Sequence, residues 1–247
     1  MLLDHVTDTP DVGIVAVLDD DTDQAKIVRF QLEDVGVQAI IADLDMVPTL
    51  ESAIQWIRGN ANAVICDVQL NNLHGGIDYD GAQLLARVIG DERIPGVLTT
   101  GFKDDVGMLV RPHRGHIPVL VSRDETEDPD ILVAGVRMCR AEIDSGRGGE
   151  RQTHRTALYI EKASMADTGV ALDARVGGWA RRISMRFPAA MLGSDFERIE
   201  HARRSVGQVF FAAVNLAATS ETELFFEDIE PELVDPERLS FHFEAEQ

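Results

Sequence analysis

The sequence predicts an α/β protein, with a doubly wound, five-stranded parallel sheet followed by a smaller, mainly α-helical domain. Five short apolar runs alternate with segments of helical periodicity between residues 11 and 144. Such alternation is typical of a parallel sheet covered by helices on both faces. A long amphipathic pattern near the C-terminus favours helices in the second half.

The apolar runs are short enough to be buried strands. They lie, in chain order, at residues 13–18, 37–42, 63–66, 96–100 and 117–121. Helical spacing of apolar residues predicts helices between them, at 22–35, 49–58, 81–89 and 129–143. The stretch 102–115 is ambiguous, and a short helix is expected near 103–110. This pattern predicts one domain over residues 11–144.

A glycine-rich polar stretch, DSGRGGE at 144–150, indicates a linker over residues 145–152. The remaining residues, 153–247, are expected to form an α-rich output or interaction domain with an acidic tail. Helices are expected at 155–166, around 171–187 and at 194–219, and a short strand at 239–243. The 194–219 prediction rests on a capping box and on apolar residues at steps of three and four: Ser194 with Glu197, and Phe196, Ile199, Ala202, Val206, Val209, Ala213 and Leu216.

The composition argues against several classes of protein. The formal net charge is −20, from 43 acidic and 23 basic residues, and so much negative charge repels a phosphate backbone. No apolar run approaches the roughly 20 residues that a membrane helix needs. The first residues lack the basic start and apolar core of a signal peptide. We therefore expect a cytoplasmic protein that binds neither nucleic acid nor membrane.

Acidic side chains follow two of the expected strands. Asp19, Asp20 and Asp21 come after the first strand, and Asp67 ends the third. Because the carboxyl ends of parallel strands meet at one edge of a sheet, these side chains should lie together. Close carboxylates repel one another, and oxygen ligands suit Mg²⁺. The sequence therefore predicts a Mg²⁺ site there, with the hydroxyl of Thr100 at the end of the fourth strand available to a phosphoryl oxygen.

Four motifs resemble the receiver domain of two-component response regulators, which has a flavodoxin-like fold. They are VLDDDTD at 17–23, VICD at 64–67, DGAQLL at 80–85 and LTTG at 98–101. Their order and spacing along the chain also fit that family. The resemblance covers residues 11–144 and does not extend to the second half.

The resemblance implies a specific role for each site residue. Asp67 would accept a phosphoryl group from a histidine kinase or phosphotransfer protein. Asp20 and Asp67 would bind Mg²⁺ directly, Asp19 mainly through water, and the backbone carbonyl of Gln69 would complete the protein ligands. Thr100 would hold a phosphoryl oxygen and move as the switch. Receiver domains often dimerise, so a homodimer is expected, and no turnover enzyme beyond phosphotransfer and autodephosphorylation.

Two departures from the family pattern leave an alternative open. The family has a lysine after its fifth strand that pairs with the phosphoryl group, but residues 121–124 read VSRD, and Arg123 is the candidate replacement. An arginine also binds phosphate, although its planar fork is not a copy of an ammonium. The loop between Asp67 and Gly81 is longer than usual and lacks the usual proline. The alternative is a pseudo-receiver adaptor that binds proteins without being phosphorylated, and the position of the Arg123 guanidinium bears on that choice.

Overall fold

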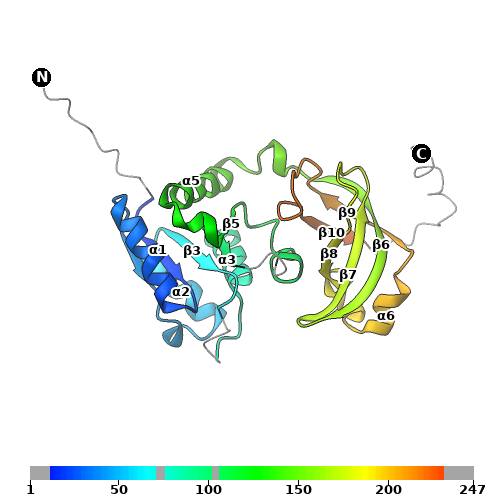
Figure 1. The fold of residues 1–247 in the computed structure, drawn as a ribbon, viewed down its shortest axis with the longest axis horizontal. Coiled ribbons are helices and arrows are strands. Elements are labelled where there is room, and N and C mark those ends of the chain that lie inside the picture. Colours follow the sequence, from blue (N-terminus) through cyan, green and yellow to red (C-terminus); the bar gives the residue numbers. More distant parts are fainter. Residues whose placement is uncertain (1–11, 71–75, 102–105, 231–247) are drawn as a thin grey trace, which may run out of the picture. The chain divides into compact units, whose positions relative to one another are not determined.

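The computed structural model describes residues 12–70, 76–101 and 106–230, and these form two compact units (Figure 1). The first unit consists of the described residues up to 101 and of residues 116–146. The second consists of residues 106–115 together with residues 147–230. The chain therefore leaves the first unit, returns to it and leaves it again.

The first unit is built on a five-stranded parallel sheet in the order β2-β1-β3-β4-β5. Its strands are β1 (Val15–Leu18), β2 (Ala39–Ile41), β3 (Ala63–Asp67), β4 (Gly96–Thr100) and β5 (Leu120–Ser122). The predicted parallel sheet is thus confirmed. The strand order reverses between β1 and β3, and ligands of such sheets bind outside the carboxyl ends of the strands at this point.

Helices cover both faces of this sheet. They are α1 (Thr22–Asp34), α2 (Leu50–Asn60), α3 (Gly81–Gly90) and α5 (Pro129–Ser145), with short 3₁₀ turns η1 (Leu44–Met46) and η3 (Arg123–Glu127). The apolar faces of α1 and α5 contribute to one buried core cluster with β1, β2 and β3, while α2 and α3 pack together. No helix among the described residues is long and apolar enough to cross a membrane.

The connection between β4 and β5 contains a short helical element within the range 103–110, where a short helix was expected. Residues 102–105 lie outside the described part of the chain. The rest consists of a π turn, η2 (Val106–Val110), followed by a tight turn through residue 116. This connection belongs to the second unit, although both strands that it joins belong to the first.

The second unit is an antiparallel sheet, so the prediction of a mainly α-helical domain was wrong. Its strand order is β10-β9-β6-β7-β8. The strands are β6 (His154–Ala166), β7 (Gly169–Val176), β8 (Met185–Pro188), β9 (Val209–Val214) and β10 (Phe226–Glu230). Short helical turns complete it: η4 (Gly149–Arg151), η5 (Ala189–Leu192), η6 (Ser194–Glu197) and α6 (Ile199–Arg204).

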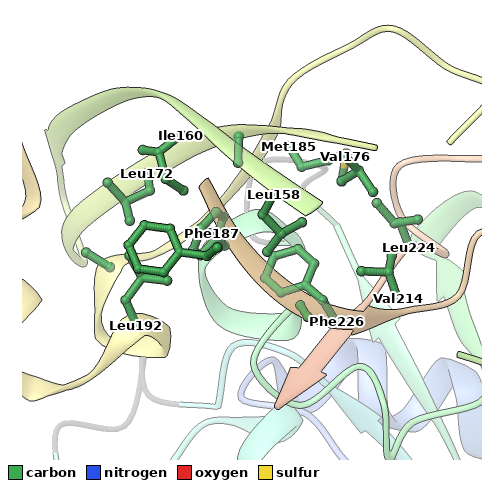
Figure 2. Close-up of a cluster of buried hydrophobic side chains, with 14 of the residues drawn as sticks. Leu158, Ile160, Leu172, Val176, Met185, Phe187, Leu192, Val214, Leu224 and Phe226 are labelled. Atoms are coloured by element: carbon green, nitrogen blue, oxygen red, sulfur yellow. The ribbon is translucent and has the colours of Figure 1, made fainter. Parts of the chain in front are cut away.

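A hydrophobic core of its own stabilises the second unit. Figure 2 shows side chains from β6, β7, β8, β9 and β10 meeting in one cluster. The rings of Phe187 and Phe226 pack edge to face with their centroids 4.9 Å apart, a favourable geometry for aromatic pairs. The indole of Trp179 is also buried, and it donates a hydrogen bond of 2.8 Å to the carbonyl of Ala218.

The helix predicted at 194–219 is replaced by η6, α6 and β9. Gly207 has a φ of +83°, a left-handed conformation that an α-helix does not contain. Beyond it, Phe210, Ala212 and Val214 are buried at alternate positions, which is the period of a strand with one face in the core. The spacing of three and four residues arose because three shorter elements follow one another along the chain.

The helices predicted at 155–166 and around 171–187 are also wrong, since these residues form β6, β7 and β8. Leu158 and Ile160 are fully buried, and Tyr159 between them is exposed. Cross-strand pairing with β7 and β9 on its two sides decides the conformation of β6. The strand expected at 239–243 lies outside the described residues.

Gly81, the first residue of α3, offers a test of how closely this helix packs on β3. A Cβ at this position would lie 1.8 Å from the carbonyl oxygen of Asp67, so Gly81→Ala must move either the helix or the strand. We expect it to lower the free energy of unfolding by at least about 2 kcal/mol, measured by urea denaturation. Gly59→Ala is the control, because nothing lies within 4 Å of its Cβ and helix propensity favours alanine by up to about 1 kcal/mol. Equal stability of the two variants would contradict the packing.

Candidate functional site

Three carboxylates meet at the carboxyl ends of β1 and β3. Asp19 and Asp20 follow β1, Asp67 is the last residue of β3, and the two strands pair in parallel up to Leu18 and Cys66. One oxygen from each of the three carboxylates lies within 4.8 Å of the other two. The side chains of Asp20 and Asp67 are buried, with their residues only 7% and 5% exposed. The structure thus brings together the three acids that the sequence predicted as a metal site.

Asp21, the third acid of the run after β1, has a different role. Its Oδ1 accepts hydrogen bonds from the backbone N–H groups of Asp23 (3.0 Å) and Gln24 (3.3 Å), so it caps the N-terminus of α1. The N–H of Asp21 in turn donates to Oδ1 of Asp19 at 2.9 Å. The start of α1 therefore orients Asp19 through the backbone.

Two donors hold the carboxylate of Asp67. The backbone N–H of Gln69 donates to Oδ2 at 3.0 Å, and the hydroxyl of Thr99 lies 3.5 Å from Oδ1. Thr99 stands directly opposite Asp67 in the β3–β4 ladder, and this register is the signal that the sequence argument missed. Thr100 is buried at the end of β4, and its expected role as switch stays a prediction, as does that of the Gln69 carbonyl.

The side chain of Arg123 reaches this group of acids. Its Nη2 lies 3.9 Å from Oδ1 of Asp67, and the side chain is 44% exposed. The turn that carries it is fixed because the N–H and hydroxyl of Ser122 donate to Glu125 at 2.8 and 2.7 Å. A Cβ at Gly101 would lie 3.7 Å from the guanidinium carbon of Arg123. The guanidinium therefore packs next to the residue that follows β4.

Burial makes the charged forms of these acids unfavourable. It raises the pKa of Asp67 to about 6, although the N–H of Gln69 and the charge of Arg123 act in the opposite direction. Burial also raises the pKa of Asp19 to about 7, against the N–H of Asp21 and with a further contribution from the charge of Asp67. Close, buried carboxylates remain ionised at neutral pH most readily when a cation compensates their charge.

The donor set fits a hard divalent cation. Carboxylate oxygens alone, at a partly open edge of the sheet, are the ligands with which Mg²⁺ is usually held, with waters completing its coordination. Asp19, Asp20 and Asp67 are the residues that would hold it. Bound there, Mg²⁺ would supply charge neutralisation to an incoming phosphoryl group.

The raised pKa of Asp67 predicts a pH-dependent stability difference between the wild type and Asp67→Asn. The folded-state pKa of about 6 exceeds the ordinary aspartate value of 3.8, so ionisation of Asp67 destabilises the folded protein progressively as the pH rises from about 4 through 6. With EDTA present, the free energy of unfolding of Asp67→Asn should increase relative to that of the wild type by up to about 3 kcal/mol between pH 4 and pH 7.5. Urea denaturation at each pH measures this gain.

Asp23→Asn is the control for that comparison. Asp23 is exposed, and its hydrogen bond and ion pair with Lys26 lower its pKa, so its removal should give a pH dependence of the opposite sign. A stability difference between Asp67→Asn and the wild type that does not change with pH would contradict the buried, ionisable cluster.

Comparisons with known proteins match a little over half of the chain. The chain matches no family model and no curated protein. Among solved structures, the signal receiver domain of a modulated diguanylate cyclase from Desulfovibrio desulfuricans G20 is 18% identical. The match covers 56% of this chain and 100% of that one, with a TM-score of 0.44.

Two further solved structures give similar values. The N-terminal domain of a response regulator/sensory box/GGDEF three-domain protein from Carboxydothermus hydrogenoformans is 20% identical over 53% of this chain and 98% of that one, with a TM-score of 0.41. A CheY-like response regulator receiver domain protein from Methanospirillum hungatei JF-1 is 16% identical over 55% and 99%, with a TM-score of 0.39. Each of these three matches to a receiver domain covers a little over half of this chain. The five-stranded parallel sheet that the sequence predicted is confirmed by the strand pairing of the first unit itself.

Proposed function

We propose that this protein is a two-component response regulator in which Asp67 accepts a phosphoryl group with the help of Mg²⁺ and the change is relayed to the antiparallel second unit. The observation that carries the proposal is the cluster of Asp19, Asp20 and Asp67, with oxygens within 4.8 Å of one another and with Asp20 and Asp67 buried. The guanidinium of Arg123, 3.9 Å from Oδ1 of Asp67, supports it.

The transfer step uses a carboxylate as nucleophile. An oxygen of Asp67 forms a new O–P bond while the donor's P–N or P–O bond breaks, and the bonding electron pair leaves with the donor. Arg123 offers positive charge where the transferred oxygens arrive, in the place of the lysine that the receiver family uses. The hydroxyls of Thr99 and Thr100 are the neutral donors at the end of β4. We assign the phosphoryl oxygen to Thr100, and to Thr99 the orientation of Asp67.

The proposed partner is a histidine kinase or phosphotransfer protein that donates the phosphoryl group. A homodimer is also proposed, because receiver domains often dimerise. Light scattering of the full chain with and without the phosphoryl mimic beryllofluoride decides between a monomer and a dimer. The net charge of −20 argues against nucleic acid as the partner.

Phosphorylation itself is tested with a small-molecule donor. Incubation with acetyl phosphate and Mg²⁺ should add the mass of one phosphoryl group to the intact protein, and Asp67→Asn should show no gain. EDTA should abolish the gain in the wild type, because the clustered carboxylates then keep their mutual repulsion. Absence of a mass gain in the wild type with acetyl phosphate and with a phosphorylated donor protein would instead favour the phosphorylation-independent adaptor.

The replacement of the family's lysine by Arg123 is tested by two substitutions. Arg123→Ala removes a charge-assisted contact worth about 1.5–3 kcal/mol, so the rate of phosphorylation should fall about 10- to 100-fold, while Arg123→Lys should retain most of it. Arg137→Ala, an exposed arginine on α5, is the matched control. If Arg123→Ala reacts as fast as Arg137→Ala, the guanidinium has no part in the transfer.

A further inference from the structure

The connection between β4 and β5 is a structural part of the second unit. We refer to its described residues, 106–115, as the bridging segment. In sequence it lies between β4 and β5, which end at Thr100 and Ser122 and follow β3, the strand of Asp67, in the order of the sheet. In space it belongs to the compact unit that contains residues 147–230, and η2 packs against β8.

Arg111 is the central anchor of the bridging segment. It is 1% exposed, and its guanidinium donates to the backbone carbonyls of Arg186 (2.9 Å), Leu224 (2.7 Å) and Glu221 (3.3 Å). The carboxylate of Glu221 lies 3.5 Å away. Burial lowers the pKa of Arg111 to about 10, so the side chain stays charged at neutral pH. A buried cation that satisfies three carbonyls cannot leave its site without leaving buried polar groups unpaired.

Other contacts fix the segment on both sides of Arg111. At its start, a Cβ on Gly107 would lie 3.3 Å from the backbone oxygen of Arg186, so the two backbones are in close approach. The guanidinium of Arg114, which is buried, donates to the carbonyl of Thr222 at 3.0 Å. These contacts tie the segment to β8 and to the chain just before β10.

The last residue of the segment accepts hydrogen bonds from two arginines that follow α5. The carbonyl of Gly115 accepts hydrogen bonds from Arg147 at 2.9 Å and from Arg151 at 2.8 Å. A Cβ on Gly115 would lie 2.0 Å from a carboxylate oxygen of Glu227, and Arg147 also pairs with that carboxylate at 2.6 Å. A glycine is therefore needed here, and the segment is held along its whole described length.

Because both of its flanking strands lead to the phosphoacceptor site, the bridging segment connects that site covalently to the core of the second unit. Thr100 and Gly101 precede it, and Arg123 follows the strand to which it leads. We propose that the bridging segment is the output element of this regulator: modification of Asp67 changes the position of the ends of β4 and β5, and the segment passes that change to β8 and to residues 221–226. This inference rests on the proposed function of Asp67.

The coupling is reciprocal by thermodynamic necessity. If the state of Asp67 alters the packing of the bridging segment, then weakening the anchor at Arg111 must alter the affinity of the site for a phosphoryl mimic. Coupling between sites in proteins is typically about 5- to 150-fold in affinity. The prediction therefore has two independent readouts, one in the second unit and one at Asp67.

Hydrogen exchange of the full-length protein with Mg²⁺, with and without beryllofluoride, tests the proposal. We expect exchange rates in peptides covering 106–115 and 221–226 to change about fivefold or more, and no change in Asp67→Asn. If beryllofluoride changes exchange around Asp67 but leaves 106–115 or 221–226 unaltered, the coupling is refuted and the phosphoacceptor stands. If beryllofluoride changes nothing in the wild type, including around Asp67, the proposed function itself fails.

A matched pair of variants separates the anchor from general damage to the second unit. Arg111→Lys keeps the charge but loses the fork of donors, and we expect it to change the beryllofluoride affinity about fivefold or more. Arg175→Ala removes an exposed side chain on β7 that is bonded to Glu161 and takes no part in the contacts described above for the bridging segment, so it should leave the affinity unchanged. Equal affinities for Arg111→Lys, Arg175→Ala and the wild type would overturn the proposal, because the lysine variant retains the buried charge and differs only in its hydrogen bonds.

Discussion

Mutual repulsion of Asp19, Asp20 and Asp67 is the constraint around which the first unit is arranged. Oxygens of these three carboxylates lie within 4.8 Å of one another at the carboxyl ends of two adjacent strands. Burying them together without a cation costs free energy: burial raises the pKa of Asp67 to about 6 and that of Asp19 to about 7, and the charges of neighbouring carboxylates raise both further. The surroundings reduce this cost through the N–H groups of Gln69 and Asp21 and the charge of Arg123.

The neighbouring elements are placed so that this edge of the sheet stays accessible to a ligand while its acids remain buried. The side chain of Asp21 caps α1, so the run after β1 contributes only Asp19 and Asp20 to the site. Gly81 lets α3 begin in direct contact with the backbone of Asp67. The side chain of Arg123 lies beside Asp67 and is 44% exposed, so its positive charge can partly compensate the negative charge of the acids.

Much of the first unit was predictable because its signals are local. Short apolar runs and helical spacing identify strands and helices a few residues long, and the rule for the carboxyl ends of parallel strands brings Asp19, Asp20 and Asp67 to one place. The contact between the hydroxyl of Thr99 and Asp67 was not predictable, since it depends on the β3–β4 register. Register is set by pairing between strands, which the spacing within one strand does not reveal.

The fold of the second unit could not be predicted because it, too, depends on pairing between strands, here between strands far apart in the sequence. β6 is held by β7 on one side and by β9, more than 40 residues away, on the other, and these non-local pairings override the helical spacing within 155–166 and 194–219. The burial of the Arg111 guanidinium could not be predicted either, because the carbonyls that accept its hydrogen bonds, on Arg186, Glu221 and Leu224, lie far along the chain. Long-range packing therefore decides both the fold of this unit and the place of the bridging segment in it.

The central claim is that the buried carboxylates form a Mg²⁺-dependent phosphoacceptor site. The most direct test is a crystal structure of the full-length protein grown with Mg²⁺ and beryllofluoride. The account predicts a cation coordinated by the carboxylates of Asp20 and Asp67, beryllofluoride bonded to Asp67, and the Arg123 guanidinium within hydrogen-bonding distance of a fluorine. Crystals grown with both reagents at saturating concentration that show neither group at Asp67 would contradict it.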